Sequence, residues 1–151
     1  MTTAFEPRDP AFEQRVRESY ARQRFLTLLG ASLERVAPGE VDIRLPFRPD
    51  LAQQHGFMHA GAMTTAVDTA CGYAALTLMP PAAAVLSVEF KVNLLAPAYG
   101  ESFLARGRVL KAGRTISVCT GEVHAWGRGD ERLVATMTAT MMCVRDRGLA
   151  D

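Results

Sequence analysis

Apolar and polar residues alternate along most of the second half of the chain, which is the period-two pattern of half-buried β-strands. The most regular stretch covers 86–94 and predicts a strand in which Ser87 lies on the polar face. The apolar face predicted for it comprises Leu86, Val88, Phe90, Val92 and Leu94. The same pattern predicts further strands over 40–47, 101–110, 115–125 and 132–144, separated by turn residues.

Two segments have helical character. The apolar residues between 10 and 29 recur at spacings of three to five, which predicts an amphipathic first helix over 10–29. The predicted apolar face of this helix comprises Phe12, Val16, Tyr20, Phe25 and Leu28. Residues 60–79 are rich in Ala, Met, Thr and Leu and end at Pro80 and Pro81, so they predict a central helix. A helix ahead of a run of antiparallel strands predicts an α+β fold whose helix covers the apolar face of the sheet.

Length and charge narrow the class of protein. The 151 residues match the length of one ordinary domain, and we predict a single domain over 1–151. The net charge of +1, from 17 basic and 16 acidic residues, gives no reason to expect nucleic acid as a partner. Three widely spaced cysteines without a Cys-x-x-Cys pair predict free thiols in a reducing compartment.

No membrane or export signal is expected. Charge and proline interrupt residues 1–20, so a secretory signal is not predicted and the cytoplasm is the expected location. Residues 60–79 are long enough to span a bilayer, but they contain four threonines, two glycines and Asp68, without a flanking basic cluster. We therefore expect this segment to be a core helix.

Asp68 is the most informative single residue. Histidines aside, it is the only acidic or basic side chain between Leu51 and Val88. An aspartate in the middle of a helix has no capping role, and its burial is unfavourable unless it has a partner. It is either a structural carboxylate bonded to nearby threonines or backbone, or a base whose pKa is raised in a cleft. Residue chemistry alone leaves these two interpretations equal.

The loop before the central helix holds a recognisable pattern. It reads Gln-Gln-His-Gly-Phe-Met-His-Ala-Gly over 53–61. This segment resembles the hotdog-fold acyl-CoA thioesterases of the phenylacetate-degradation (PaaI-like) family, which show an Asn or Gln, then Gly-x-x-His-Gly-Gly, then a helix with an Asp or Glu. The matching positions are Gln53, Gly56, His59, Ala60, Gly61 and Asp68, and Ala60 replaces the first glycine of the pair. The resemblance covers roughly 41–144.

The resemblance implies a fold and an activity. The fold is a long central helix wrapped by a single antiparallel sheet, with an N-terminal helical segment over 1–30 and a hotdog core over 31–145. The activity is hydrolysis of an acyl-CoA thioester with a medium-chain or aromatic acyl group. Asp68 is then the general base or nucleophile, and Gln53 orients water or substrate. The N–H groups of Ala60 and Gly61 form the oxyanion hole at the positive end of the helix dipole, and Ser87 assists from the following strand.

Candidate substrate contacts occur in the loop, in the central helix and near the later strands. Phe57, Met58 and Met63 are expected to wall the acyl pocket. Gly56 and His59 belong to the substrate loop, in which His59 is expected to stabilise the loop. The phosphates of coenzyme A need basic residues on a surface groove, and the candidates are Lys91, Lys111, Arg114 and Arg128. Gly113 and Arg114 have the better claim, because they resemble the family's turn between these strands. His124 is expected to be a solvated strand position.

Neither a cofactor nor a metal is expected, because the sequence has no dinucleotide glycine fingerprint and no metal cluster. His55 and His59 have the i, i+4 spacing of zinc ligands, but Gly56 lies between them and no third ligand is evident. The expected partners are the acyl-CoA substrate and a second copy of the chain. The regular 85–94 strand predicts a homodimer formed by edge pairing, with a dimer of dimers as the next level. In the family, the carboxylate and the oxyanion donors generally come from opposite subunits.

Two other functions use the same scaffold. A hotdog hydratase or dehydratase carries a catalytic His or an Asp-His pair on other segments, and this signature is not evident. A non-catalytic acyl-CoA-binding module would bind the same ligand in the same cleft without turnover. A panel of acyl-CoA substrates separates these possibilities.

Overall fold

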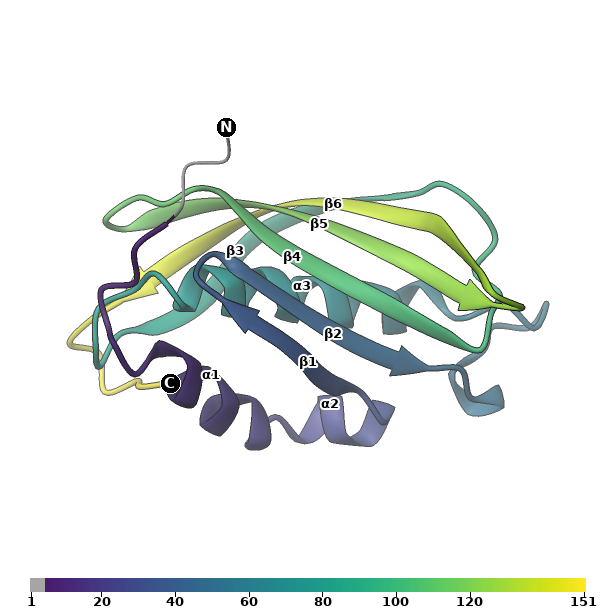
Figure 1. Cartoon of the computed structure of the whole chain (residues 1–151), viewed down its shortest axis with the longest axis horizontal. Coiled ribbons are helices and arrows are strands. Elements are labelled where there is room, and N and C mark those ends of the chain that lie inside the picture. The colour runs from purple at the N-terminus through teal and green to yellow at the C-terminus, as the bar shows by residue number, and fades with distance from the viewer. Residues whose placement is uncertain (1–4) are drawn as a thin grey trace.

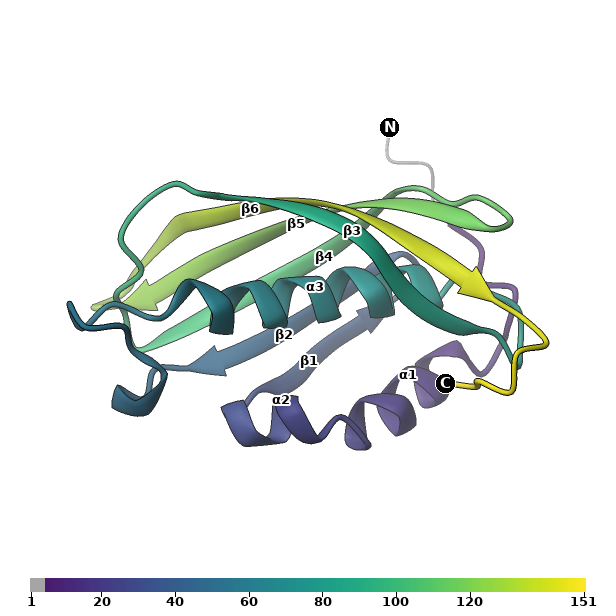
Figure 2. The same ribbon diagram turned by 180° about the vertical axis from the view of Figure 1, so that it is seen from behind.

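A six-stranded antiparallel sheet curls around one long helix in the computed structural model, which describes residues 5–151 (Figures 1 and 2). The helices are α1 (Phe12–Ala21), α2 (Arg24–Leu29) and α3 (Ala60–Leu76), with a 3₁₀ turn at Pro49–Leu51. The strands are β1 (Ser32–Ala37), β2 (Glu40–Pro46), β3 (Ala84–Leu94), β4 (Ser102–Lys111), β5 (Ile116–Gly127) and β6 (Asp130–Val144). Their order in the sheet is β1-β2-β4-β5-β6-β3. The predicted α+β fold, a central helix wrapped by a single antiparallel sheet, is confirmed.

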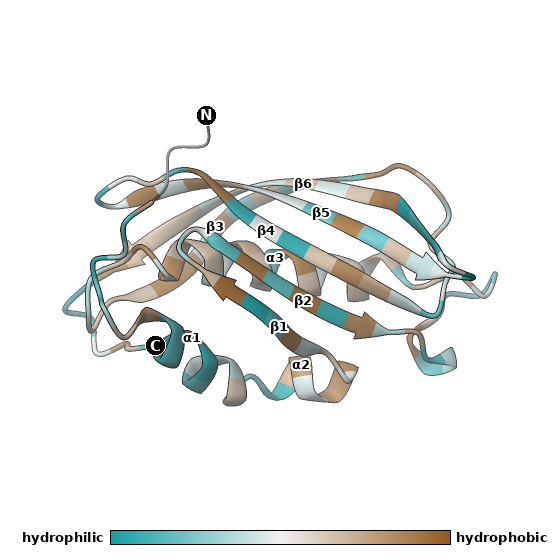
Figure 3. Cartoon of the chain, viewed as in Figure 1, coloured by the Kyte–Doolittle hydropathy of each residue, from teal (hydrophilic) through white to brown (hydrophobic). Residues whose placement is uncertain are grey.

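The helices and strands fall into two parts of the chain. The helices α1 and α2 lie within 1–30, of which residues 1–4 are outside the described part, and all six strands lie within 31–145. Figure 3 shows polar and apolar residues alternating along β4 and β5. No helix of residues 5–151 is both long enough and apolar enough to cross a membrane.

Two glycines that face each other on neighbouring strands allow α3 to lie close to the sheet. Gly107 of β4 pairs with Gly121 of β5. A Cβ at Gly107 would lie 2.3 Å from the carbonyl carbon of Ala70, and a Cβ at Gly121 would lie 2.4 Å from Cγ2 of Val67. Both distances are far below van der Waals contact, so neither position has room for a side chain. The middle of α3 is therefore held directly against the sheet.

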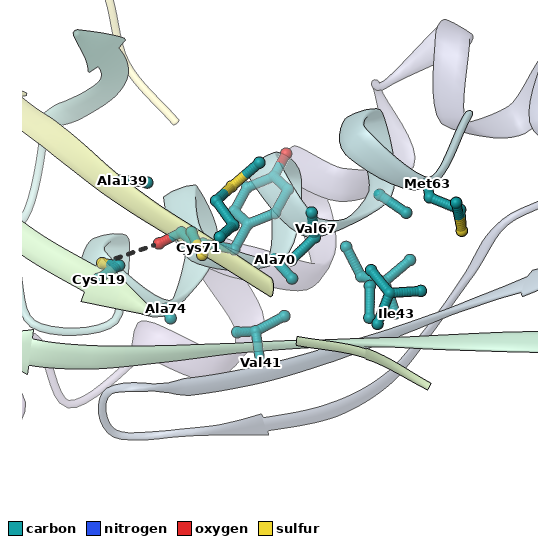
Figure 4. Close-up of a cluster of buried hydrophobic side chains, with 14 of the residues drawn as sticks. Val41, Ile43, Met63, Val67, Ala70, Cys71, Ala74, Cys119 and Ala139 are labelled. Atoms are coloured by element: carbon teal, nitrogen blue, oxygen red, sulfur yellow. Dashed lines mark hydrogen bonds between the residues drawn. The ribbon is translucent and has the colours of Figure 1, made fainter. Parts of the chain in front are cut away.

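Small and branched apolar side chains fill the core between α3 and the sheet. Figure 4 shows Val41 and Ile43 of β2 beside Val67 and Ala70 of α3. These side chains are fully or almost fully buried. All three cysteines are buried and free, in agreement with the predicted free thiols.

A largely covered arginine of α1 holds the carboxyl end of α3. Arg15 donates hydrogen bonds to the carbonyl oxygens of Leu76 (2.9 Å), Met79 (3.2 Å) and Pro80 (2.8 Å). Its guanidinium also pairs with Asp9 at 3.0 Å, and its side chain is 10% exposed. The last carbonyls of a helix lack partners within the helix and attract positive charge. Arg15 therefore fixes α1 against α3, a role that the sequence pattern did not indicate.

The first helix differs from the prediction, because it is broken into α1 and α2. Gln23 has a non-helical backbone (φ −76°, ψ 89°) between the two helices. A spacing of five cannot keep Tyr20 and Phe25 on one face of a continuous helix, and the break allows α2 to pack with Leu26 and Leu29 buried instead. After the break the buried face shifts by one residue. Leu26 and Leu29 are buried, whereas Phe25 and Leu28 are exposed.

Two other boundaries differ. The helix α3 ends at Leu76 instead of Met79, because Thr77 Oγ1 donates to the carbonyl of Ala74 (2.6 Å) and accepts from the N–H of Gly39 (2.7 Å). The strand β1 was not predicted. A register irregularity between Leu33 and Arg35 interrupts its alternation, so the sequence lacks a period-two signal there.

Candidate active site

The carboxylate of Asp68 reaches from the middle of α3 to the edge strand β3. Its Oδ1 accepts a hydrogen bond of 2.7 Å from Ser87 Oγ. Burial raises the pKa of Asp68 above its ordinary value, and the hydrogen bond from Ser87 lowers it to a smaller extent. A half-buried carboxylate with a raised pKa is a stronger base than an exposed aspartate.

A β-bulge brings Ser87 to the inner face of the sheet. Ser87 pairs with Met141 of β6, and the next pair is Glu89 with Thr140, so Val88 is an extra residue. Directly paired residues share a face, and Met141 is fully buried. Ser87 therefore faces α3, and its predicted position on the polar face is wrong. The extra residue changes which side chains face inward, and sequence alternation alone cannot reveal this.

The bulge also divides the apolar face predicted for β3. Phe90 pairs with the buried Ala139, so Phe90 lies on the inner face together with Ser87. Leu86, one position before Ser87, faces outward and is exposed. The predicted grouping of Leu86 with Phe90 is therefore wrong for the same reason.

A small pocket opens beside Asp68, with a volume of about 110 Å³. We call it the Asp68 pocket. Its lining residues are Gln23, Asp68, Thr69, Gly72, Tyr73, Val85, Ser87 and Asp151. Gln23, Tyr73 and Asp151 were not predicted as site residues. They come from the α1–α2 break, the helix α3 and the end of the described chain, and no local motif links them.

The amino end of α3 is capped by His59. Its Nδ1 accepts a 2.8 Å hydrogen bond from the backbone N–H of Gly61. The N–H groups of Ala62 and Met63 donate to the carbonyl of His59. Within residues 5–151, the N–H of Ala60 has no hydrogen-bond partner. Of the two predicted oxyanion donors, Ala60 therefore has a free N–H, and Gly61 donates to the cap.

Replacement of the family's glycine by Ala60 introduces no backbone strain. Ala60 is the first residue of α3 and is absent from the residues with positive φ. At Gly61 a Cβ would lie 3.0 Å from Nδ1 of His59, so a glycine there leaves room for the cap. Position 60 therefore accepts a side chain, whereas position 61 favours glycine, although both are glycines in the family motif.

The loop before α3 is closed by hydrogen bonds within itself. Gln53 Oε1 accepts from the N–H of His55, and the backbone N–H of Gln53 donates to the carbonyl of Phe57 (2.9 Å). Gly56 has a φ of +84°, which a glycine adopts without strain. His59 N–H donates to the carbonyl of Leu51 (2.8 Å). Gln53 and His59 therefore stabilise the loop in the isolated chain.

The residues expected to wall the acyl pocket lie elsewhere in the isolated chain. Met58 and Met63 are buried members of the main core. Phe57 lies next to Tyr99, with ring centroids 6.4 Å apart. None of these three residues lines the Asp68 pocket.

The predicted coenzyme A contacts form the turn between β4 and β5. Lys111 and Arg114 are exposed. A Cβ at Gly113 would lie 2.1 Å from the carbonyl oxygen of Ile116, so this tight turn requires a glycine. Gly113 and Arg114 line a narrow crevice together with Ala75, which places the turn near the carboxyl end of α3.

His124 is more enclosed than the sequence suggested. Its Nε2 lies 2.7 Å from Glu122 and its Nδ1 lies 3.0 Å from Glu131, and the side chain is 14% exposed. The expectation of a solvated strand position is therefore wrong. Among the residues described, no three His, Cys, Asp or Glu side chains gather in a way that could hold a metal ion.

Within one chain the site consists of two separate halves. Asp68 and Ser87 form one half, and Ala60 with the His59 cap forms the other. Asp68 lies eight positions after Ala60 on α3, which corresponds to about 12 Å along the axis. The carbon and oxygen of one thioester carbonyl cannot contact both groups of the same chain.

The sequence profile described as the thioesterase superfamily matches residues 55–131. The chain belongs to the thioesterase superfamily. The matched segment contains the end of the loop, all of α3 and β3, and therefore Ala60, Asp68 and Ser87.

Two relatives of this thioesterase-superfamily chain are candidate esterases. The protein of Halobacterium salinarum is 34% identical over 98 residues, covering 62% of this chain and 64% of the relative. The protein of Saccharolobus solfataricus is 32% identical over 95 residues, covering 63% of this chain and 65% of the relative. The matches thus span slightly less than two thirds of either relative.

Solved structures give the same family and fold. A thioesterase family protein from Silicibacter pomeroyi is 51% identical, with a TM-score of 0.87 over 88% of this chain and 98% of that protein. The PaaI protein of the E. coli phenylacetic acid degradation operon is 17% identical, with a TM-score of 0.79 over 89% of this chain and 94% of that protein. This second similarity concerns the fold alone. The predicted hotdog fold is confirmed.

Proposed function

We propose that this protein hydrolyses the thioester bond of an acyl-CoA, with Asp68 as the catalytic carboxylate. The observation that carries the proposal is the position of Asp68, a half-buried carboxylate with a raised pKa beside Ser87 and a pocket. Membership of the thioesterase superfamily supports thioester hydrolysis. A medium-chain or aromatic acyl group is the proposed substrate type.

Two chemical routes fit this carboxylate. As a general base, Asp68 takes a proton from water, the water oxygen adds to the carbonyl carbon, and the C–S bond then breaks. As a nucleophile, Asp68 adds to the carbonyl carbon and releases the thiolate of coenzyme A, and water hydrolyses the resulting anhydride. The thiolate receives a proton and leaves as free coenzyme A in both routes. Ser87 positions the carboxylate through its hydrogen bond.

The oxyanion donor proposed here is the N–H of Ala60 in a second subunit. This group is unpaired at the amino end of α3, where the helix dipole stabilises negative charge. Because about 12 Å separates the two halves within one chain, a complete site requires Asp68 from one subunit and Ala60 from another. Gln53 and the loop around Ala60 then contact the substrate from that second subunit.

The strand β3 provides the surface for this second subunit. It is at one edge of the sheet, so its outer backbone groups have no strand partner among residues 5–151. Phe90 and Leu94 lie on the inner face of β3, yet they are 44% and 57% exposed. A second copy that pairs along 85–94 would bury them. We propose a homodimer of this kind, able to assemble further as a dimer of dimers.

A mixture of two inactive variants tests the shared site. Asp68→Asn removes the carboxylate, and Ala60→Pro removes only one N–H. Proline is well tolerated at the first position of a helix, and the preceding His59 already has the extended conformation (ψ 133°) that proline favours. After the subunits are mixed and reassembled, about a quarter of wild-type activity should return, since half of the dimers are mixed and one of their two sites is intact.

The controls are the two variants alone, each checked for folding by circular dichroism and for mass by light scattering. Both should be dimeric and nearly inactive. A mixture without recovered activity contradicts a shared site, and a strictly monomeric wild-type protein at micromolar concentration contradicts the dimer.

A substrate panel tests the reaction itself. Short, medium, long and aromatic acyl-CoAs are incubated with the protein, and release of free thiol is followed. Acyl-CoA binding without turnover would contradict hydrolysis and support a non-catalytic binding module. Hydration of an enoyl-CoA without thiol release would support a hydratase.

The remaining features of the proposal concern coenzyme A and the cellular context. Lys111 and Arg114 are proposed to contact the phosphates of coenzyme A, beside the turn glycine Gly113. No cofactor is proposed, so extensive treatment with a chelator should leave the activity unchanged. Three buried free thiols fit a reducing compartment, and we propose the cytoplasm.

A further inference from the structure

A chain of hydrogen bonds forms the far wall of the Asp68 pocket. Gln23 Nε2 lies 3.2 Å from the Tyr73 hydroxyl, which lies 3.0 Å from Ser19 Oγ. Ser19 Oγ lies 2.9 Å from Oδ1 of Asp151. The backbone N–H of Val85 lies 2.7 Å from Oδ2 of Asp151. The chain therefore joins α1, the α1–α2 break, α3, the start of β3 and the last described residues.

The chemistry of these groups fixes the direction of every bond. An ionised carboxylate only accepts hydrogen bonds, so Ser19 donates its single proton to Asp151. Tyr73 must then donate to Ser19, and Gln23 donates its amide to Tyr73. Ser19 and Tyr73 are buried. Because the hydroxyl protons of Ser19 and Tyr73 are both used in these hydrogen bonds, the bonds hold the side chains of this wall in place.

The last described residues lie over this wall. Figures 1 and 2 show the end of the chain next to α1, beneath the edge of the sheet formed by β3. The side chain of Asp151 lines the Asp68 pocket itself. The carboxylate of Asp151 thus closes a pocket that already contains the carboxylate of Asp68.

The helix side of the pocket is kept open by a glycine. Gly72 lies one turn after Asp68 on α3 and also lines the pocket. A Cβ at Gly72 would approach only Met141 Sδ, at 4.0 Å. An alanine would therefore fit without a clash and would fill part of the void.

The charged side chains that line the pocket are all acidic. Its eight lining residues include two carboxylates and no basic residue. Arg22, the neighbour of Gln23, is exposed and donates to the carbonyl of Glu18. An acyl group with a terminal carboxylate would place a third negative charge in this space, and none of the lining residues is a cation that could pair with it.

We propose that Gln23, Gly72 and Asp151 determine the acyl specificity of the site and limit the length and the charge of the acyl group that it accepts. The inference rests on the proposed thioester hydrolysis. The carbonyl carbon must lie within reach of Asp68, and the Asp68 pocket is the space next to that carboxylate. The pocket has a volume of about 110 Å³ and ends at the wall that contains Gln23, Tyr73 and Asp151. This wall therefore sets how far an acyl group can extend into the pocket.

Three variants test the inference through ratios of kcat/KM, which do not depend on the fraction of folded enzyme. Gln23→Ala opens the far end of the pocket. The ratio of kcat/KM for a longer straight-chain acyl-CoA to kcat/KM for a shorter one should therefore rise by roughly tenfold or more, which is the usual effect of a methylene in a binding pocket. Gly72→Ala narrows the pocket and should lower the same ratio. Asp151→Asn should raise the ratio of glutaryl-CoA to valeryl-CoA, two acyl groups of equal length that differ in charge.

The matched controls are Gln14→Ala on the exposed face of α1 and Asp146→Asn in the same final segment. Neither Gln14 nor Asp146 lines the Asp68 pocket. Both variants should keep the wild-type ratios. Unchanged ratios in all three test variants would overturn the inference, while Asp68-dependent turnover by the wild type would leave the proposed function intact. Failure of the wild type to hydrolyse any acyl-CoA would instead overturn the proposed function itself.

Discussion

Ser87 Oγ donates a 2.7 Å hydrogen bond to Asp68 Oδ1, and a bulge in β3 makes this contact possible. In a regular strand without the bulge, Ser87 and Phe90 are three positions apart and would face opposite sides of the sheet. The bulge thus allows one strand to supply a polar partner for the carboxylate and an apolar surface for the proposed second subunit.

Loss of the Ser87 hydroxyl should change the pH dependence of hydrolysis. Its hydrogen bond lowers the pKa of Asp68, which burial raises. Ser87→Ala should therefore raise that pKa further and move the acidic limb of kcat/KM to higher pH, because a base must be ionised to act. Ser87→Thr retains the hydroxyl and should keep the limb near its wild-type position. A pH profile of Ser87→Ala that overlays the wild type would contradict this role.

The raised pKa of Asp68 also predicts how stability depends on pH. A carboxyl group with a higher pKa in the folded state binds its proton more tightly there, so its stabilising effect is lost as the pH rises through the folded pKa. Ionised Asp68 is then unfavourable for folding at neutral pH. The Tm of Asp68→Asn should equal or exceed that of the wild type at neutral pH, and any increase in Tm should disappear at acidic pH. A clear fall in Tm at neutral pH would identify Asp68 as a structural carboxylate.

Two cysteines should resist thiol reagents in the folded protein. Burial raises the pKa of Cys119 to about 12 and raises that of Cys71 as well. Since the thiolate is the reactive form, both should stay unmodified by dithiobis(nitrobenzoate) until the protein unfolds, when all three cysteines should react. Rapid labelling of more than one thiol per native chain would disagree with the buried positions. Low reactivity also keeps the background of a thiol-release assay small.

The contact of α3 with the sheet predicts opposite effects for two glycine substitutions. Gly107→Ala should destabilise the protein by about 3 kcal/mol or more, because its Cβ would lie 2.3 Å from the backbone of Ala70. Gly72→Ala is the matched control, since its Cβ has room and alanine favours a helix by about 1 kcal/mol. Urea denaturation measures both. Equal stabilities for the two variants would contradict the close approach of α3 at Gly107.

Regular patterns in the sequence predicted most of the fold. The alternation over 40–47 and the end of the helix before Pro80 located β2 and α3 because these features depend on local periodicity and on the chemistry of proline. The bulge at Val88 and the break at Gln23 are set by tertiary packing, so the faces predicted around them were wrong. A single inserted residue changes the face of every residue beyond it.

The residues of the candidate site also differ in whether the sequence could predict them. Asp68 stood out because no other acidic or basic residue, histidines aside, occurs near it in the sequence, and the loop pattern located Ala60. Gln23 and Asp151 meet only in the folded chain, 128 positions apart in the sequence, and neither belongs to a motif. Long-range contacts of this kind leave no periodic signal.

The turnover of Asp68→Asn tests the central claim most directly. The substitution preserves the shape of the side chain and removes the base. If Asp68 is the catalytic carboxylate, kcat for the preferred acyl-CoA should fall by about 100-fold or more, while acyl-CoA binding and the Tm are retained. Near wild-type turnover by a well-folded Asp68→Asn protein would contradict the mechanism.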